Sequence, residues 1–261
     1  MSEQTSGDLR GEDLINDLLV GGDEAEKLFA GVAGIGESYA SGGAGGMRIL
    51  HLLDEPWDSG ITAYAIQTAD LLKNAGHDVV LGILSGKKPE RLAQQKNLPT
   101  QPINTIAQLR TLYRSGWDVI NVHTGRSHTW MVLFNFFSRK KIPIVRTRGD
   151  ARLVSGNPLS RFVYRRTAAA IAASDHVAKQ YEEEFGFNEE NLETIYPSVT
   201  PQKNAVAADP LRVGILGRLD PVKGHSIFLE AAATVLKEIP QARFAVAGKE
   251  AGVSISILKN Q

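Results

Sequence analysis

Short apolar runs alternate with longer segments of helical periodicity from Met47 onward, and this alternation constrains the fold more than any other feature. The runs expected to form strands cover residues 48–53, 77–84, 117–123, 142–148, 169–174 and 192–198. The segments expected to form helices cover residues 60–76, 105–116, 128–141, 158–168 and 175–187. Because parallel neighbours need crossover helices, these six strands predict an α/β fold with a doubly wound parallel sheet.

A polar, proline-flanked segment at residues 199–210 interrupts this alternation and indicates a linker. The pattern then resumes with an expected strand, helix and strand at residues 211–217, 224–239 and 242–248. One unit of this size is too small to bury both faces of its sheet. We therefore expect a complete N-terminal domain at residues 47–198 and the truncated start of a second domain at residues 211–261.

Residues 1–46 differ from the rest of the chain in charge. They hold nine acidic and two basic residues, whereas the remainder holds 20 acidic and 27 basic ones. The stretch "SYASGGAGG" before Met47 is typical of a flexible linker. We expect an acidic leader or expression tag fused to a domain that begins at Met47. The alternative is a small docking or assembly peptide.

Several function classes are disfavoured by composition and motif. The chain has no cysteine, which excludes disulfides and thiolate metal sites. No apolar run approaches the roughly 20 residues of a membrane span, and the N-terminus shows no secretory pattern, so we expect a cytoplasmic location. The segment after residues 48–53 lacks G-x-G-x-x-G, which disfavours a dinucleotide-dependent dehydrogenase. We expect no nucleic-acid partner, because the basic residues form no known module.

The stretch "GRLDPVKGHSIFLEA" at residues 217–231 carries two cations between an expected strand and a helix start. Arg218 can hold a phosphate through two hydrogen bonds, and Lys223 adds a point charge. Gly224 allows close approach of the backbone, and the unpaired N–H groups of the helix start favour an anion. These residues predict a diphosphate site. The alternative is a surface turn with two exposed cations.

This stretch closely resembles the G-R-L-x-x-x-K-G motif of glycosyltransferase family 4, which has the GT-B fold. "MRILHLLDEPWDSGITAYAIQTADLLKNAGHDVVL", "WDVINVH" and "AAIAASDHVAKQYEEEFGFNEENLETIYPSV" resemble other motifs of the family, in the family's order. The resemblance covers nearly all of residues 47–255 and none of residues 1–46. It implies a GT-B-like arrangement with a Rossmann-like acceptor-side domain, followed by the start of a donor-binding domain.

The family transfers a sugar from a nucleotide-diphosphate sugar to an acceptor hydroxyl, usually with retention and without an essential metal. The resemblance assigns the catalytic role to Arg218 and Lys223, which would stabilise the leaving diphosphate. Gly217 and Gly224 would complete the diphosphate-binding turn. No cofactor and no metal site are expected. The implied partners are the nucleotide sugar and a glycan or lipid-linked acceptor, in assembly of lipopolysaccharide or another cell-surface glycan.

Candidates for the acceptor side follow two expected strands. The family has two glycines after its first strand, where this chain has Ser59 and Gly60. His123 and Arg126 follow the strand at residues 117–123 and could bind hydroxyl groups. The alternatives are an ordinary tight turn for the first pair and, for His123, a satisfied histidine of the core.

A third acceptor-side candidate departs from the family pattern. Many members have T-H-G with a sugar-binding histidine, where this chain has Arg148. Arg148 and Asp150, with Arg146 and Arg152, suggest a charged pocket for an anionic acceptor. The alternative is a salt-bridged surface loop.

Basic and aromatic residues mix at residues 136–141 and 160–166, which suggests peripheral contact with the inner membrane face. A solvated helix face is the alternative.

The family's E-x-x-x-x-x-x-E region, which binds the donor, is missing after Gly248, so we expect this chain to be inactive alone. Two other readings stay open, a GT-B enzyme like the nucleotide-sugar 2-epimerases and a non-catalytic scaffold fusion.

Overall fold

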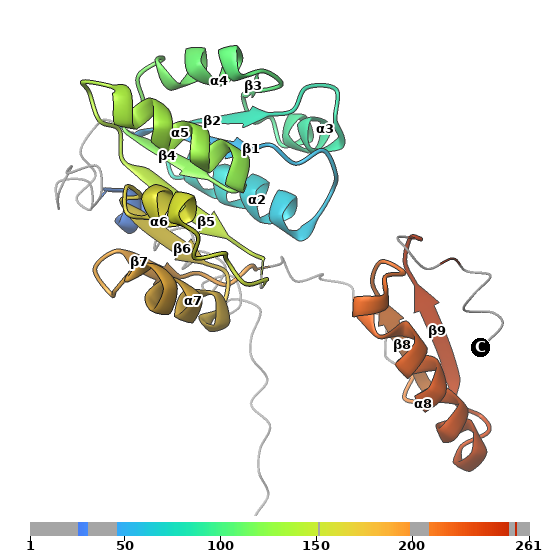
Figure 1. The fold of residues 1–261 in the computed structure, drawn as a ribbon. Coiled ribbons are helices and arrows are strands. Elements are labelled where there is room, and N and C mark those ends of the chain that lie inside the picture. The colour runs from blue at the N-terminus through green and yellow to red at the C-terminus, as the bar shows by residue number, and fades with distance from the viewer. Residues whose placement is uncertain (1–25, 31–45, 151, 199–208, 251–253, 255–261) are drawn as a thin grey trace, which may run out of the picture. The chain divides into compact units, whose positions relative to one another are not determined.

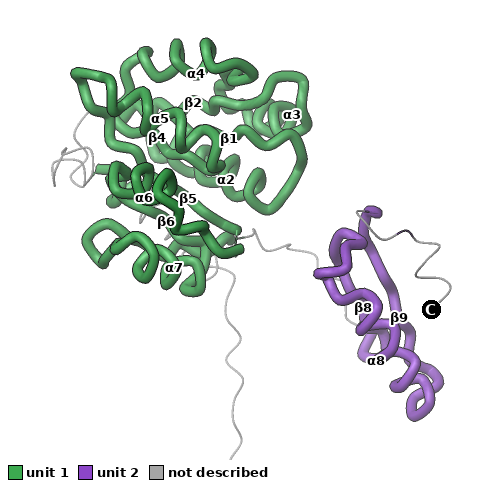
Figure 2. Tube along the Cα trace, viewed as in Figure 1, with its two compact units in different colours: residues 1–201 green, residues 202–261 purple. Residues whose placement is uncertain are grey.

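The computed structural model describes residues 26–30, 46–150, 152–198, 209–250 and 254. The chain divides into two compact units, Met1–Pro201 and Gln202–Gln261, here called unit 1 and unit 2 (Figure 2). The expected linker at residues 199–210 falls mostly outside the described residues.

Unit 1 is built on a parallel sheet of seven strands (Figure 1). Its strands are β1 (Arg48–Leu53), β2 (Asp78–Ile83), β3 (Thr100–Pro102), β4 (Val119–Val122), β5 (Ile144–Arg148), β6 (Ala169–Ala172) and β7 (Leu192–Thr194). Their order is β3-β2-β1-β4-β5-β6-β7, so the chain winds outward in both directions from the β1–β4 pair. The predicted doubly wound α/β fold is confirmed.

Helices cover both faces of this sheet. One face packs α2 (Gly60–Asn74) and α3 (Lys88–Gln95) over apolar residues of β1, β2 and β4. The other face packs α4 (Ile106–Tyr113), α5 (Gly125–Phe137) and α6 (Pro158–Tyr164). Beside β6 and β7, α7 (Asp175–Phe185) contributes Tyr181 to a third apolar cluster. A sheet buried on both faces explains why its strands appear as continuous apolar runs in the sequence.

The expectation of six strands was wrong, because β3 adds a seventh at the edge of the sheet. Its three residues, Thr-Gln-Pro, are polar or proline and show no strand pattern, which an edge position tolerates. The helix α3 was also unassigned, since only Pro89 and Ala93 of its eight residues are buried. The expected helix at residues 128–141 instead runs from Gly125 to Phe137, and Ser138 already has extended backbone.

Helix starts follow the capping residues in the sequence. The hydroxyl of Ser59 accepts a hydrogen bond from the backbone of Thr62 at the start of α2. Thr105 and Gln108 form a reciprocal capping box at the start of α4. Side-chain caps of this kind satisfy N–H groups that the first helical turn leaves unpaired, which fixes where each helix begins.

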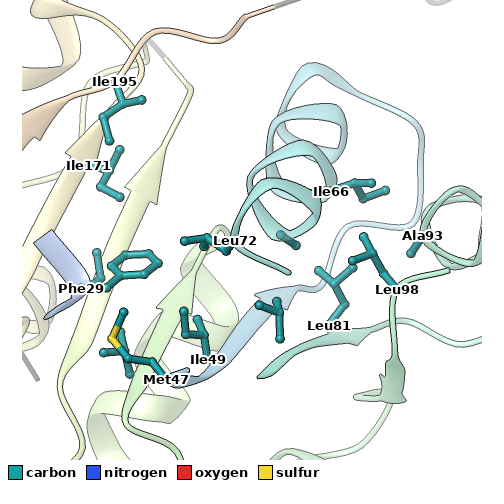
Figure 3. Close-up of a cluster of buried hydrophobic side chains, with 14 of the residues drawn as sticks. Phe29, Met47, Ile49, Ile66, Leu72, Leu81, Ala93, Leu98, Ile171 and Ile195 are labelled. Carbon is teal, nitrogen blue, oxygen red and sulfur yellow. The ribbon is translucent and has the colours of Figure 1, made fainter. Parts of the chain in front are cut away.

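Residues 26–30 are helical and pack into unit 1, although the sequence analysis expected a leader there. The side chain of Phe29 is fully buried among Met47, Ile49 and Leu72 (Figure 3). A carboxylate oxygen of Glu26 also lies 3.2 Å from Nε2 of His77. The rest of the expected leader lies outside the described residues. Part of residues 1–46 therefore belongs to the core of unit 1.

Unit 2 holds a strand–helix–strand unit. Its elements are β8 (Arg212–Leu216), the short 3-10 helix η1 (Pro221–Lys223), α8 (His225–Glu238) and β9 (Arg243–Ala247). The two strands pair in parallel. Leu216, Val222 and Ile227 are each more than two-thirds exposed, so the described part of unit 2 leaves much apolar surface uncovered. In the described part of the chain, no helix combines the length and the apolar character that crossing a membrane requires.

Candidate functional site

The sheet of unit 1 reverses its winding between β1 and β4, which lie side by side from Ile49–Val119 to Leu52–Val122. In open α/β sheets, ligands bind in the crevice outside the carboxyl ends of the strands at this reversal. The loop at residues 54–59 follows β1, and residues 123–124 lead from β4 into α5. We call this region the β1–β4 crevice.

Asp54 is the first residue after β1, and the sequence analysis did not single it out. Its carboxylate is only 2% exposed, accepts a hydrogen bond from Oγ of Ser127 at 3.3 Å and lies 3.7 Å from the guanidinium of Arg126. Burial raises the pKa of Asp54, and the nearby charges of Arg126 and Arg146 oppose that rise. The available signal was that Asp54 is the first polar residue after a buried strand, but its side-chain partners Arg126 and Ser127 come from α5, far away in the sequence.

The predicted residues Ser59 and Gly60 lie at the start of α2. The hydroxyl of Ser59 caps the helix and donates to a carboxylate oxygen of Glu55 at 2.7 Å. Gly60 is exposed, and a Cβ at this position would meet no atom within 4 Å. Ser59 is thus engaged in the cap, whereas Gly60 leaves the backbone accessible. The acceptor-side role given to both residues stays a prediction.

His123 lies at the end of β4, but its side chain is directed into the core. It is 2% exposed, and its Nε2 lies 3.0 Å from Nδ1 of His51 in β1. Asn121 is close to both rings and accepts a hydrogen bond from Thr147 at 2.8 Å. Burial lowers the pKa of His51 to about 3 and holds the pKa of His123 well below its usual range. Both imidazoles are therefore neutral at pH 7.

Arg126 lies in the first turn of α5, and its side chain is 45% exposed. The residue before this helix, Thr124, makes no side-chain hydrogen bond to the helix backbone, and the first turn holds no acidic residue. The start of α5 therefore presents a cation and N–H groups that have no partner within the helix. This arrangement favours a negatively charged group.

Arg148 and Asp150 lie at the end of β5 but differ in burial and in hydrogen-bond partners. Arg148 is 6% exposed and donates to the side chain of Gln180 at 3.0 Å and to the carbonyl of Arg152. Asp150 accepts hydrogen bonds from the guanidinium and backbone of Arg152, and the first of these is the main reason why the pKa of Asp150 is lowered. Arg148 is thus committed inside unit 1, while the Asp150–Arg152 pair lies at its surface. Their acceptor-side role also stays a prediction.

In unit 2, the turn from Gly217 to Gly224 holds the predicted diphosphate-binding residues. The guanidinium of Arg218 is 65% exposed and lies 3.6 Å from the carboxylate of Asp220. Lys223 is exposed and makes no ion pair with any described residue. Gly224 has a φ of 71° in the left-handed region, where glycine is favoured, and α8 begins directly after it. This turn of eight residues thus holds both cations, and the N–H groups at the start of α8 follow it directly.

Two contacts fix the shape of this turn. His225, 3% exposed, donates from Nε2 to the carbonyl of Arg218 at 2.8 Å. A Cβ on Gly248 would overlap the carbonyl oxygen of Gly217, so the chain needs glycine where the end of β9 passes the end of β8. The sequence alone did not indicate this contact of His225. Within the described ranges, no group of three or more histidine or acidic residues could hold a metal ion.

Comparison with known proteins places these features in a family context. The sequence profile of Glycosyltransferase Family 4 matches residues 59–203, which is more than half of the chain. No curated protein sequence gives a match.

Solved structures with the same fold include three bacterial proteins. HepE from Anabaena, solved with UDP and glucose, is 18% identical with a TM-score of 0.59, over 82% of this chain and 64% of HepE. A glycosyltransferase from Rickettsia africae is 13% identical with a TM-score of 0.59, over 83% of this chain and 70% of its own. MurG from Acinetobacter baumannii is 15% identical with a TM-score of 0.50, over 82% of this chain and 61% of MurG. The chain thus spans less than two thirds of HepE, and at these identities the likeness shows the fold.

Proposed function

Because the chain belongs to glycosyltransferase family 4, we propose that it takes part in transfer of a sugar from a nucleotide-diphosphate sugar to an acceptor hydroxyl. The observation that carries this proposal is the turn of unit 2, where Arg218 and Lys223 flank the free start of α8. An exposed lysine that has no ion-pair partner among the described residues, next to the start of a helix, is suited to a diphosphate.

The chemistry follows from where charge appears. The bond between the anomeric carbon and a phosphate oxygen breaks, and a new bond joins that carbon to the acceptor oxygen, whose proton passes to solvent. Negative charge then develops on the departing diphosphate. Arg218, Lys223 and the N–H groups at the start of α8 come from one short stretch of chain and stabilise this charge where it develops. Retention at the anomeric carbon is the outcome that the family resemblance implies, and the proposed reaction needs no metal.

His225 acts on this site through Arg218. Its hydrogen bond holds the carbonyl of Arg218, and thus the backbone from which the guanidinium extends. We assign His225 as a positioning residue, since its ring is buried. Gly224 lets the backbone turn sharply into α8, which aims the helix start at the same point.

Calorimetric titration with UDP tests the proposed site, because HepE was solved with this nucleotide. UDP should bind the full chain more tightly than UMP, and Lys223→Ala and Arg218→Ala should each weaken UDP binding about tenfold or more, as loss of a charge-assisted hydrogen bond does. Lys237→Ala, in the last turn of α8, is the matched control. UDP affinity that is the same in the Lys223, Arg218 and Lys237 variants would overturn the proposal.

We also propose a cytoplasmic enzyme of cell-surface glycan assembly, lipopolysaccharide included, that contacts the membrane peripherally. The setting follows from the family resemblance. The contact is supported by a surface of α5 and α6 on which Phe136, Phe137 and Leu159 are 46%, 81% and 57% exposed. The basic residues Arg139, Lys140, Lys141, Arg161, Arg165 and Arg166 are exposed in the same segments. Apolar side chains bordered by cations suit an anionic bilayer.

Vesicle sedimentation tests this contact. The full chain should sediment with vesicles that contain phosphatidylglycerol and less with pure phosphatidylcholine, and added salt should release it. Replacing Lys140 and Lys141 by glutamate should reduce binding. The same change at Lys73 in α2 and Lys96 at the end of α3 should not, because these helices cover the opposite face of the sheet. Equal sedimentation with both vesicle types would contradict an electrostatic contact.

A further inference from the structure

The cations around the β1–β4 crevice outnumber the acids. Arg126 and Arg146 both act on the buried carboxylate of Asp54, whereas Arg148 is engaged by Gln180 and by the carbonyl of Arg152. Of the three arginines, only Arg126 makes an ion pair with a described residue, and its distance of 3.7 Å is longer than a hydrogen bond. One positive charge therefore has no counterpart among these groups.

Arg146 is the clearest sign that a ligand belongs there. It is 7% exposed and makes one hydrogen bond to the described residues, from Nη1 to the carbonyl of Val122 at 3.1 Å, while its buried Nε has no partner among them. A buried polar group without a partner costs free energy, and a buried charge costs more. The carbonyl that accepts this hydrogen bond belongs to Val122, the last residue of β4, so the guanidinium of Arg146 lies at the carboxyl end of that strand.

The start of α5 adds donors at the same place. Its N–H groups receive no side-chain cap from Thr124, and Arg126 extends from its first turn toward Asp54. The helix has 13 residues, enough for its dipole to favour an anion at this end. An anion bound here would lie next to the guanidinium of Arg126 and would be attracted by the charge of Arg146.

We propose that the β1–β4 crevice binds the anionic group of a charged acceptor sugar, a phosphate or a carboxylate, between Arg126 and the start of α5. This inference rests on the proposed transferase function, because it names the chemical class of the acceptor. It assigns Arg126 to binding and Arg146 to positioning through its charge.

Calorimetry of the full chain with glucose 6-phosphate, glucuronate, inorganic phosphate and glucose tests the inference. The measurement uses Arg218→Ala/Lys223→Ala as the background, which removes the proposed diphosphate site of unit 2. One of the two charged sugars should bind at least about tenfold more tightly than glucose and than inorganic phosphate. Whether that sugar is the phosphate or the carboxylate then assigns the class. Because the background lacks the diphosphate site, failure of the UDP experiment would leave this result unchanged.

Three variants in that background localise the binding. Arg126→Ala should weaken binding of the charged sugar about tenfold or more. Arg110→Ala, which replaces an exposed arginine of α4, should leave that affinity unchanged. Arg126→Lys should recover part of the affinity, since it restores the charge without the planar fork. Circular dichroism checks that each variant is folded. Equal affinity for glucose and both charged sugars, tightest binding by inorganic phosphate alone, unchanged affinity in Arg126→Ala, or no binding at millimolar ligand would overturn the inference.

Discussion

Nδ1 of His51 and Nε2 of His123 lie 3.0 Å apart in the interior of unit 1, so neighbouring strands place two titratable rings in direct contact. The rings are stacked, with centroids 5.3 Å apart, and the edge of the Phe29 ring packs against His51. Only one of the two facing nitrogens needs to carry a proton for a hydrogen bond. The pair is therefore compatible with the core only while it is neutral.

This pair makes the stability of unit 1 sensitive to acid. The pKa of His51 is lowered to about 3, while in the unfolded chain it is near 6.5. Below about pH 6.5 the unfolded state binds a proton that the folded state does not, so stability is present above that pH and is lost as pH falls toward about 3. The loss approaches about 1.4 kcal/mol per pH unit for His51 alone.

Urea unfolding followed by tryptophan fluorescence measures this effect, because all three tryptophans belong to unit 1. The free energy of unfolding should fall between about pH 7 and pH 5, and His51→Gln should flatten that dependence. The exposed His176→Gln variant serves as the control. The same slope in the wild type and His51→Gln would refute the role of the pair.

Phe29 should contribute to the stability of unit 1, although it lies before Met47. Its ring is fully buried, so Phe29→Ala should lower the free energy of unfolding by about 3–5 kcal/mol. Phe137, 81% exposed, is the matched control, and Phe137→Ala should cost less than about 1 kcal/mol. If residues 26–30 were instead a detachable leader, Phe29→Ala and Phe137→Ala would lower the free energy of unfolding by similarly small amounts.

Gly82 should not tolerate a side chain. A Cβ there would collide with Leu52 and would lie 2.9 Å from a methyl of Leu112, so Gly82→Ala should cost about 1–3 kcal/mol through overpacking. Gly60→Ala is the control for this stability measurement, since its Cβ would enter open space. Chemical unfolding that places both variants at the wild-type midpoint would show that β2 and α4 are less tightly packed than described.

The main elements could be predicted from the sequence, because burial on both faces makes the central strands continuously apolar and caps mark the helix starts. β3 and α3 could not be predicted, since an edge strand and a mostly exposed helix leave no apolar pattern. The turn at Gly217–Gly224 is local and was recognisable. The contacts of Asp54 and Arg146 were not, because they depend on the strand order that sets β4 between β1 and β5.

His225 should influence UDP binding without touching the nucleotide. Loss of its hydrogen bond to the carbonyl of Arg218 should weaken UDP binding about fivefold in His225→Leu, since a neutral hydrogen bond contributes roughly 1 kcal/mol. His225→Gln retains a donor and should restore most of the affinity. Calorimetry on both variants decides the point, and equal weakening by leucine and glutamine would assign His225 to packing alone.

The most direct test of the proposed donor site is the response of backbone amides to UDP in nuclear magnetic resonance spectra of the full chain. The account predicts that the largest shifts fall on residues 217–226, which form the turn and the start of α8. Those shifts should disappear in Lys223→Ala at the same UDP concentration. Shifts centred outside residues 217–226, or the same shifts in Lys223→Ala, would contradict the assignment of this turn to the diphosphate.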